Sequence, residues 1–493
     1  MDLVAFIAPF TPPSAIEADV FDCLHGDEQT KHPFPLRQLA DYIIHKKSAA
    51  FIKEFINKEN LLYSLDEPIY KGLRLLHYAV YQDEMRTLQL LLDMGADPNV
   101  ADDMGYTPVH ICAEKGYGHL IKILMSYGAR LRFTGINSQD HDTGNVHRAL
   151  VEEPLRLAIR NSHHKTQRFL LDRGANPNAI YFRGSEINLV NPSDVKSIEL
   201  LLQYGADVNA RDWQGLTPLM KACRSGENIQ TVHLLLRHGA DINAMSKGDE
   251  QTALHYAVLN NNLEAAKFLV NNGAQVCFPS EQTKPPPLYY AVLRGNVEML
   301  EFLLDSGADI NALSAALGSA LHLALSEDIS NQLEIVYTLL LRGANPNAIT
   351  VEEGRTVLQP PIGEYLQNSE HPRLDIIKLL LRYGARIILE IQQNHNLGIL
   401  KVIHRVHIGL NLEIMTLLLE ASESFNVCYI RESAQLTEDH KDMLYMKALQ
   451  PFFLQHIARI QLRKFLGWGP RFFDAVHNLK LPKSLKNYIL FHE

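Results

Sequence analysis

Hydrophobic residues along this chain recur in blocks of about 34 residues, and residues 213–244 form a clear example. Two apolar stripes at helical spacing predict two short helices in this block. The first stripe contains Leu219, Ala222 and Cys223, and the second contains Val232, Leu234, Leu235 and Leu236. Thr217-Pro218 favours a helix start, because a threonine hydroxyl caps free amides and proline fits the first helical position. Gly239 fits the left-handed position that ends a helix.

The same helix ending returns along most of the chain. Clear copies of Gly-Ala-Asp/Asn-x-Asn begin at Gly95, Gly174, Gly205, Gly239, Gly307 and Gly343, and weaker copies begin at Gly128, Gly273 and Gly384. A helix pair of this size cannot bury its apolar face alone, so neighbouring pairs must stack into a solenoid. The sequence therefore predicts one all-α array rather than several globular domains.

The start of each block carries a second motif. Gly-x-Thr-Pro-Leu-His is legible, with small changes, at Gly105–His110, Gly215–Leu219 and Thr252–His255. Together with the Gly-Ala-Asp-x-Asn-Ala ending, this pattern resembles the ankyrin repeat over residues 71–390. The resemblance implies an ankyrin-repeat solenoid with about nine recognisable repeats and degenerate repeats at its ends.

Departures from the repeat period predict the other segments. Residues 1–70 are expected to hold an irregular start, up to about residue 35, and a helix pair between Leu36 and Leu65 that acts as a degenerate capping repeat. Residues 391–450 are expected to form another degenerate repeat and connecting helices. Long spacings between repeat endings predict insertions at 132–147 and 359–373, and insertions of this kind often lie on the binding face.

The last segment, residues 451–493, differs in charge from the rest. It holds seven Lys or Arg residues against Asp474 and Glu493, although the whole chain has a net charge of -9. Leu454, Ala458, Leu462 and Phe465/Leu466 recur at helical spacing, with Ile457 beside them, and predict an amphipathic helix whose other, polar side carries Gln455, Arg459 and Arg463. Gly467-Trp468-Gly469-Pro470 ends this helix, and a second helix is expected over residues 472–479.

This segment resembles a SOCS box, and repeats followed by it resemble the ankyrin repeat and SOCS box protein family. The resemblance implies that the first helix binds elongin C, with elongin B as its companion, through Leu454, Ile457, Ala458 and Leu462. It also implies that a later segment selects a cullin associated with a RING-box protein, through Leu479, Leu481, Pro482, Leu485, Tyr488 and Ile489.

Two features depart from the family pattern. Phe453 stands where a small residue is usual, and Ala458 stands where a cysteine is usual; loss of the sulfur contact costs on the order of 1 kcal/mol. Lys480 replaces a proline in the family's Leu-Pro-Leu-Pro segment. The family usually binds cullin-5, so the resemblance implies cullin-5. The remaining segment also resembles the box used for cullin-2, which is therefore the alternative.

Composition narrows the cellular setting and the partners. A net charge of -9 argues against general nucleic-acid binding. Five scattered cysteines favour reduced thiols in the cytoplasm, with the nucleus as a second compartment. Met1–Phe10 lacks the basic residues of a signal peptide, and no apolar run approaches the ~20 residues of a membrane helix. We therefore expect no membrane partner.

No residue pattern predicts catalysis, a metal or a cofactor. His77, His110, His255 and His322 occupy the repeat's Thr-Pro-Leu-His position and are expected to form hydrogen bonds between repeats. Asn209, Asn243 and Asn311 resemble substrates of the asparaginyl hydroxylase that modifies ankyrin repeats, but bridging adjacent turns is the simpler role. On the predicted turns, Trp213, Asp212, Asp103 and Lys247 are candidates for binding an unknown protein substrate, although Trp213 could instead pack against the next turn.

The sequence leaves two functions to compare. The leading hypothesis is a non-catalytic substrate-recognition subunit of an elongin B/C–cullin–RING ubiquitin ligase, which brings a target close to the ubiquitin-transfer machinery. The alternative is an ankyrin scaffold or adaptor whose C-terminal helices serve only as a cap. The two differ in whether the apolar face around Leu454 is open or covered by the preceding helices.

Overall fold

The computed structural model describes residues 34–131, 152–181, 183–226, 229–248, 250–277, 285–314, 317–326, 329–352, 355–391, 396–406, 412–450 and 453–491. These residues belong to two compact units, unit 1 within Met1–Asp207 and unit 2 within Val208–Glu493. The predicted insertion at 132–147 and the predicted irregular start, up to residue 33, lie outside the described residues.

Unit 1 consists of paired helices with one small hairpin. Its elements are α2 (Phe34–Ile44), α3 (Ala49–Lys58), the 3-10 helix η1 (Leu61–Tyr63), α4 (Leu75–Tyr81), α5 (Met85–Asp93), α6 (Pro108–Lys115), α7 (Gly118–Ser126), α8 (Pro154–Arg160), α9 (His164–Asp172), β1 (Ile180–Tyr181), β2 (Gly184–Ser185), α10 (Glu186–Leu189) and α11 (Val195–Gln203). The helix pair predicted between Leu36 and Leu65 is confirmed by α2 and α3. Residues of α2 and α3 pack on α4 and α5, so this pair covers the apolar end of the first repeat.

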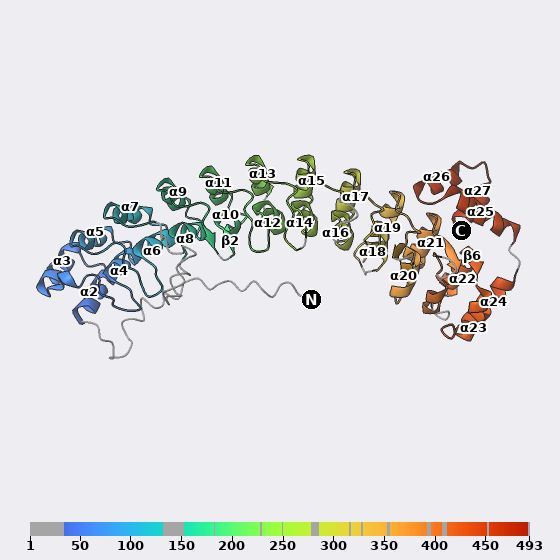
Figure 1. Cartoon of the computed structure of the whole chain (residues 1–493), viewed down its shortest axis with the longest axis horizontal. Helices are drawn as coiled ribbons and strands as arrows, with labels where there is room; N and C mark the ends of the chain where they lie inside the picture. Colours follow the sequence, from blue (N-terminus) through green and yellow to red (C-terminus); the bar gives the residue numbers. More distant parts are fainter. Residues whose placement is uncertain are drawn as a thin grey trace. The chain divides into compact units, whose positions relative to one another are not determined.

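Unit 2 begins with five further helix pairs. They are α12 (Pro218–Ser225) with α13 (Ile229–Arg237), α14 (Ala253–Leu259) with α15 (Leu263–Asn271), α16 (Pro287–Leu293) with α17 (Val297–Asp305), α18 (Ala320–Ser326) with α19 (Gln332–Leu341), and α20 (Pro361–Asn368) with α21 (Leu374–Arg382). The first helices of these pairs form one row and the second helices form another (Figure 1). This stacking of helix pairs is the predicted ankyrin solenoid.

The block at residues 213–244 folds as its sequence predicts. The Thr217 hydroxyl accepts a hydrogen bond from the Met220 amide at 3.3 Å and caps α12. Leu219, Ala222 and Cys223 of α12 and Val232 and Leu235 of α13 are buried. Gly239 follows α13 with a φ of 85°, which glycine adopts without steric cost.

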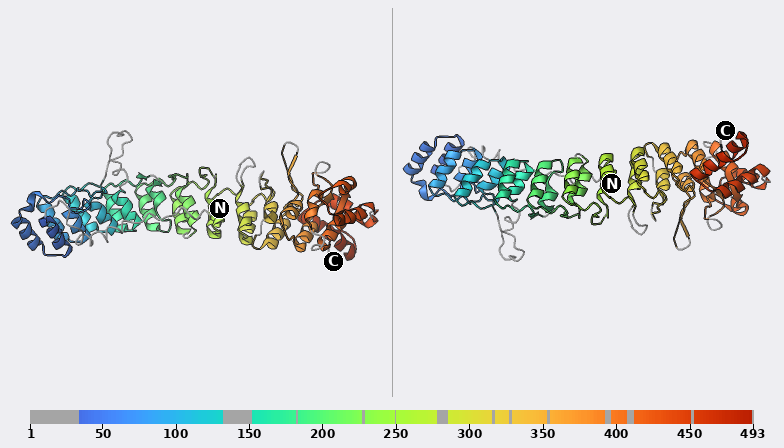
Figure 2. Two further views of the ribbon diagram at one scale, coloured as in Figure 1. Left: turned by 90° about the horizontal axis from the view of Figure 1, so that it is seen from below. Right: turned by 90° about the horizontal axis from the view of Figure 1, so that it is seen from above.

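One prediction about the later repeats needs correction. The extra residues expected at 359–373 lie mainly in an antiparallel hairpin before that range, formed by β3 (Thr350–Glu352) and β4 (Arg355–Leu358). Figure 2 shows this hairpin projecting from the helix pairs of unit 2. Residues 361–368 instead form the regular helix α20, because Pro361 and the apolar pattern that follows suit a helix start. A short loop at 369–373 holds the remaining extra residues.

The described residues between 391 and 450 form a 3-10 helix, a short strand and three α-helices. The stripe containing Leu400, Val402 and Ile403 forms a 3-10 helix, η3 (Leu400–Arg405), whereas the next stripe forms α22 (Leu412–Ala421) as expected. Strand β5 (Ile387–Leu389) pairs in parallel with β6 (Ser422–Phe425), which the sequence did not predict. Helices α23 (Val427–Glu432) and α24 (Glu438–Leu449) follow, and α25 (Leu454–Leu466), α26 (Pro470–Asn478) and α27 (Lys483–Leu490) complete the described chain.

The repeat histidines His77 and His322 join neighbouring repeats, as predicted for them. In His77 and His322, Nδ1 accepts a hydrogen bond from the backbone amide that precedes its own helix, at 3.0 and 3.1 Å. Their Nε2 atoms donate to carbonyls of the next repeat, Tyr106 O at 3.1 Å and Gln359 O at 2.9 Å. Both ring nitrogens are used by the neutral imidazole, and burial lowers the pKa of His77 to about 4.

We expect these histidines to make the fold sensitive to acid. Burial also lowers the pKa of His255 to about 4, below the value near 6.5 of an unfolded chain. A proton therefore binds the unfolded chain more tightly, so the free energy of unfolding contributed by this group falls as pH drops from about 6.5 to about 4. The expected slope is about 1.4 kcal/mol per pH unit for each such histidine.

Denaturant titrations between pH 7 and pH 5 test this expectation. His255→Gln should be less stable than the wild-type chain at pH 7, and the difference should shrink toward pH 5, because the variant no longer binds that proton on unfolding. His404→Gln is the control, since His404 is half-buried and its Nδ1 donates to the carbonyl of Lys401 only three residues away. An equal pH slope for the wild type and His255→Gln would contradict the assignment.

Candidate docking surfaces

The C-terminal helices α25, α26 and α27 pack around a small core of their own. Phe472 and Val476 of α26 and Ile489 and Leu490 of α27 are buried at its centre, and Leu462, Leu466, Phe473, Leu479 and Leu481 pack against them. The predicted first helix is α25, and the second, expected at 472–479, is α26 at 470–478. Two of the residues expected to contact a cullin, Leu479 and Leu481, therefore lie half-buried at the edge of this core.

Two arginines on the polar side of α25 face the protein. Arg459 and Arg463 lie on the side opposite the apolar stripe, as predicted, and both are buried, whereas Gln455 is exposed. His456 is buried with them. The two arginines can be buried because carbonyl groups and aromatic rings of other elements stabilise their positive charges.

Arg463 joins three parts of unit 2. Its Nη2 donates to the carbonyls of Leu381 at 2.6 Å and Ala385 at 3.1 Å, at the C-terminal end of α21, and its Nη1 donates to Ile489 O at 3.0 Å. The last carbonyls of a helix have no partner within the helix and attract cations. The guanidinium also lies 5.0 Å from the ring of Phe472. Burial lowers the pKa of Arg463 to about 9, so the side chain stays charged at neutral pH.

Arg459 lies near the middle of α25, one turn before Arg463, and also holds the helix in place. Its guanidinium lies 4.4 Å from the ring of Tyr488 and 4.3 Å from the ring of Phe491, and it donates to the carbonyl of Glu420. His456 accepts from Arg459 at Nδ1 and donates from Nε2 to Ser422 O at 2.9 Å. These contacts fix α25 against α22, β6 and α27 with its polar side inward.

The turn after α25 also fits closely against the last repeat. The Gly469 amide donates to Tyr383 O at 2.8 Å, and the rings of Tyr383 and Phe473 stack. A Cβ atom on Gly384 would lie only 2.9 Å from Trp468 Cα, so glycine is required there. The three-helix module is therefore held to α21 by main-chain as well as side-chain contacts.

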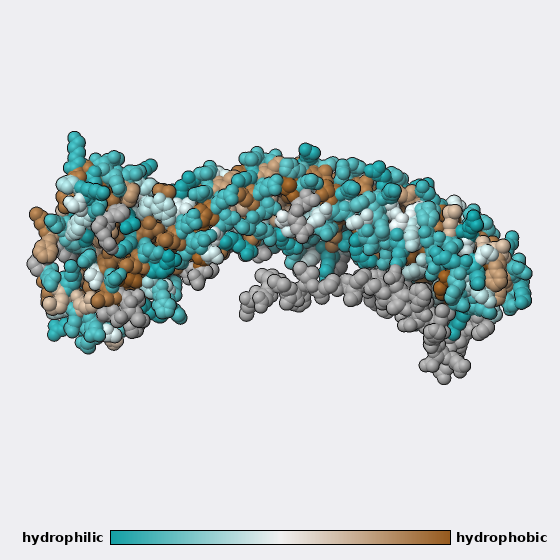
Figure 3. Space-filling view, turned by 180° about the vertical axis from the view of Figure 1, so that it is seen from behind, coloured by the Kyte–Doolittle hydropathy of each residue, from teal (hydrophilic) through white to brown (hydrophobic). Residues whose placement is uncertain are grey.

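The inward polar side leaves the apolar side of α25 open. Leu454 is 82% exposed, Phe453 is 81% exposed and Phe465 is 87% exposed, and Ile457 and Ala458 are also exposed. Of the residues expected to bind elongin C, only Leu462 is half-buried, because it packs against the core of the three helices. Hydrophobic surface is visible among the C-terminal elements in Figure 3. An open stripe of large apolar side chains is typical of a helix that docks into a partner.

The residues near α27 that were predicted to contact a cullin fall into an exposed group and a structural group. Pro482 and Leu485 are exposed at the start of α27 and are available to a partner. Ile489 is buried in the core, and Tyr488 covers Arg459, so these two hold α27 in place. Of the six residues predicted to contact a cullin, only Pro482 and Leu485 are therefore exposed.

On the repeat turns of unit 2, Trp213 and Lys247 are exposed but Asp212 is not. Trp213 is 66% exposed, so it does not pack away against the next turn. Asp212 accepts hydrogen bonds from the amides of Gln214 at 2.9 Å and Leu216 at 2.8 Å, and its other oxygen lies 2.7 Å from Lys221 Nζ. Asp212 thus shapes the turn that presents Trp213. Asp103, the candidate in unit 1, is exposed.

Asparagines connect adjacent repeat turns, which is the simpler of the two roles predicted for them. Asn209 donates to Gly239 O at 3.3 Å and accepts from the Asp241 amide at 2.7 Å. Asn243 and Asn311 form the same pair of bonds with the following repeat. Cys277 occupies the equivalent position between them, where its thiol donates to Gly307 O.

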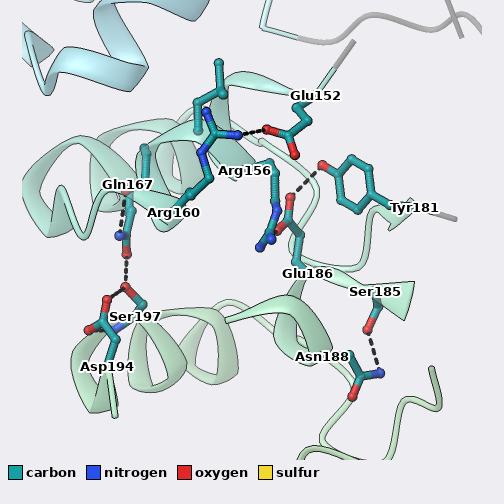
Figure 4. A network of polar contacts seen from close by, with 12 residues as sticks. Glu152, Arg156, Arg160, Gln167, Tyr181, Ser185, Glu186, Asn188, Asp194 and Ser197 are labelled. Atoms are coloured by element: carbon teal, nitrogen blue, oxygen red, sulfur yellow. Dashed lines mark hydrogen bonds and ion pairs between the residues drawn. The ribbon is translucent and has the colours of Figure 1, made fainter. Parts of the chain in front are cut away.

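Unit 1 contains a buried polar network that the sequence analysis missed (Figure 4). Tyr181 donates to Glu186 Oε1 at 2.6 Å, and Arg156 Nη1 lies 3.8 Å from Glu186 Oε2. Burial raises the pKa of Glu186 to about 7, although Arg156 opposes the shift. The sequence does mark this network, because two repeats replace Thr-Pro-Leu-His with Glu-Pro-Leu-Arg and Ser-Glu-Ile-Asn. The network ties the β1–β2 hairpin to α8.

The described residues contain neither a metal-binding cluster nor a helix that could span a membrane. Within the described ranges, no group of three or more His, Cys, Asp or Glu side chains is placed to hold a metal ion. Among the helices of the described chain, none is long and apolar enough to cross a membrane.

Two protein family models match this chain, one in the repeats and one in the C-terminal helices. A family model described as ankyrin repeats (3 copies) matches residues 42–140, 76–181, 190–280 and 277–350. A family model described as the SOCS box matches residues 450–490, which contain α25, α26 and α27. The repeat matches together cover more than half of the chain.

Individual relatives match only parts of the repeat region. Bovine NF-kappa-B inhibitor zeta is 30% identical over 156 residues, which are 31% of this chain and 20% of that protein. Ankyrin repeat protein FPV244 of fowlpox virus is 30% identical over 184 residues, which are 37% of this chain and 25% of that protein. The chain thus spans a quarter or less of these relatives.

Two solved ankyrin repeat domains align with about half of the chain. The ankyrin repeat domain of human ASB11 is 20% identical with a TM-score of 0.40, and the match covers 48% of this chain and 98% of that domain. The ankyrin repeat domain of Bcl-3 is 23% identical with a TM-score of 0.40, and the match covers 50% of this chain and all of that domain.

Proposed function

Because this chain belongs to the ankyrin repeat and SOCS box family, we propose that it is the substrate-recognition subunit of an elongin B/C–cullin–RING ubiquitin ligase. A SOCS box implies binding of elongin B/C and of a cullin in general. The repeats would hold the target and the C-terminal helices would hold the ligase, so that a target lysine stays close to the transferred ubiquitin. The chain itself would perform no chemical step.

The exposed apolar side of α25 is the observation that carries this proposal. A helix that only capped the last repeat would turn its apolar side inward, because covering that surface is the purpose of a cap. Here Leu454, Ile457 and Ala458 point to solvent, whereas Arg459 and Arg463 point inward. The alternative, a scaffold with a helical cap, explains the buried arginines but leaves the open apolar stripe without a role.

The turns of unit 2 support the substrate part of the proposal. Large exposed aromatic residues are frequent anchors in protein interfaces, and Trp213 stands on a turn whose shape is fixed by Asp212. The turn fits against its neighbour, because a Cβ atom on Gly215 would lie 2.6 Å from the Lys247 amide nitrogen. Trp213 and Lys247 thus lie on adjacent turns and could contact one protein segment. Asp103 is a separate candidate on a turn of unit 1.

The cysteines support a reducing compartment. The four cysteines within the described ranges, Cys112, Cys223, Cys277 and Cys428, are free thiols. Cys112 and Cys223 are buried, and burial raises the pKa of Cys223 to about 12, so this thiol is unreactive. We propose that the chain works in the cytoplasm, or in the nucleus, where thiols of this kind stay reduced.

We further propose cullin-5 as the cullin, with its RING-box protein, and expect Leu485 to contact it. The change Leu485→Asp places a charge on the exposed edge of α27 and should weaken cullin-5 binding about tenfold or more, while elongin B/C binding stays within about twofold. The measurement is the affinity of cullin-5 for the purified complex of the chain with elongin B/C.

Cullin-2 and Leu293→Asp serve as the comparisons for this experiment. Leu293 has almost the same exposed fraction as Leu485, 37% against 38%, but lies on α16 in the repeats. The wild-type complex should bind cullin-5 more tightly than cullin-2, and Leu293→Asp should bind cullin-5 like the wild type. Tighter binding of cullin-2 would reverse the assignment, and normal cullin-5 binding by Leu485→Asp would remove Leu485 from the contact.

A further inference from the structure

The helix before the SOCS box, α24, carries large apolar side chains on its outer side. Met446 is 61% exposed and Leu449 is 60% exposed, and residues three apart in a helix lie on the same face. The inner side of α24 is already filled by His440 and Leu444, which are buried. A helix that packs on one side ordinarily keeps its other side polar, so the outer pair needs an explanation.

The outer pair of α24 lies near the exposed stripe of α25. Leu449 and Phe453 are four residues apart, so their Cα atoms can be separated by no more than about 14 Å. Five large exposed apolar side chains fall within residues 446–457: Met446, Leu449, Phe453, Leu454 and Ile457. The apolar surface of α25 thus continues toward the N-terminus, beyond the three-helix core.

The size of a stable interface indicates why this continuation matters. A helix of 13 residues is about 20 Å long and about 10 Å across, so the half of its surface that one partner can cover is roughly 300 Å². A stable interface covers about 800 Å² on each partner. Elements beside α25 must therefore contribute to the contact.

The exposed side chains of the neighbouring helices point to α24. On α26 the exposed residues are polar or charged, namely Arg471, Asp474, His477 and Asn478. On α24 the second half exposes Met446 and Leu449, and the exposed charged residues, Glu438, Asp439 and Asp442, lie in its first half. Since the centre of an interface is depleted in charge and enriched in apolar residues such as Met, α24 is the better extension of the α25 stripe.

We propose that elongin C contacts α24 through Met446 and Leu449 as well as α25, an inference that rests on the proposed function. The docking surface then consists of Met446, Leu449, Phe453, Leu454 and Ile457. It begins before the SOCS box itself, so a SOCS box separated from α24 binds elongin C more weakly than the full chain does.

The test compares the affinity of purified elongin B/C for full-length variants. Met446→Ser combined with Leu449→Ser should raise the Kd about tenfold without changing the Tm, because both side chains are on the surface. Met245→Ser combined with Leu293→Ser is the matched control, since these residues are 36% and 37% exposed on repeats of unit 2. The control should bind within about twofold of the wild type.

Amide hydrogen exchange gives a second readout on the unaltered chain. Residues 438–450 should become protected when elongin B/C binds, together with residues 453–466. If the α24 variant keeps the wild-type Kd and residues 438–450 stay unprotected, the inference is wrong. If the variant instead only abolishes self-association of the chain, a second copy covers α24, and the inference is equally overturned.

The variant Leu454→Asp separates this inference from the proposed function. Loss of elongin B/C binding in Leu454→Asp with an unchanged Kd in the α24 variant rejects the extension and keeps the proposed function. An unchanged Kd in Leu454→Asp rejects the proposed function itself. A weakened Kd in the α24 variant, with normal binding by the control, supports the extension.

Discussion

Leu454→Asp is expected to abolish binding of elongin B/C, with a rise in Kd of at least about 100-fold. Leu454 begins α25 and is 82% exposed, so the change costs the free chain little stability. In a complex the same position would be covered by the partner. Truncating a central apolar anchor typically costs 2–4 kcal/mol of binding free energy, and an unpaired carboxylate adds its desolvation. About 3 kcal/mol corresponds to the expected factor.

Isothermal titration of the purified chain with elongin B/C measures this effect. Leu293→Asp is the control, because it introduces the same charge at an exposed leucine of the repeats. Its Kd should equal that of the wild type, and the thermal unfolding of both variants should remain close to wild type. Wild-type binding by Leu454→Asp would leave the scaffold with a helical cap as the better explanation of the C-terminal helices.

Arg463→Met is expected to lower the free energy of unfolding of unit 2 by about 3 kcal/mol. The change removes the donor that the carbonyls of Leu381, Ala385 and Ile489 share inside a buried contact, and within the described chain only Leu381 O keeps a bond, from the Gly384 amide. Each buried acceptor without a partner costs about 1–3 kcal/mol, and removing one side of a buried charged contact typically costs 3–5 kcal/mol. The Tm should fall by on the order of 5–10 °C.

Hydrogen exchange should locate the loss in the C-terminal helices. Amides of α27 and of the end of α21 should exchange faster in Arg463→Met, because Arg463 connects these two elements. Arg471→Met is the control, since Arg471 is exposed on α26 and its replacement should change stability by less than about 0.5 kcal/mol. Equal stability of the two variants would mean that Arg463 contributes nothing to the joint.

Local patterns were sufficient to predict the repeats from the sequence. Thr217-Pro218 and Gly239 mark the start and end of a helix pair through caps that depend on neighbouring residues only. The histidines and asparagines of the motif bond to atoms about one repeat away, so their roles recur wherever the motif recurs. The helix boundaries of the C-terminal segment followed from the same kind of local signal, Gly467-Trp468-Gly469-Pro470.

Irregular repeats were harder to predict, because they break the pattern on which the prediction depended. The extra residues before α20 pair with one another as a hairpin, and a spacing alone does not say where in a repeat the surplus lies. The contact between Arg156 and Glu186 replaces motif residues in two successive repeats, and neither substitution suggests a charge pair by itself.

The amino-acid sequence by itself determined the stacked helix pairs, the position of α25 and the apolar stripe that begins at Leu454. Only the tertiary structure decided which side of α25 faces the protein. The partners of Arg463 at α21 lie 82 and 78 residues away in the chain, so no local pattern contains them. Because those carbonyls and the rings of Phe472 and Phe491 accept the buried cation, the arginines turn inward and the leucine stripe is left for a partner.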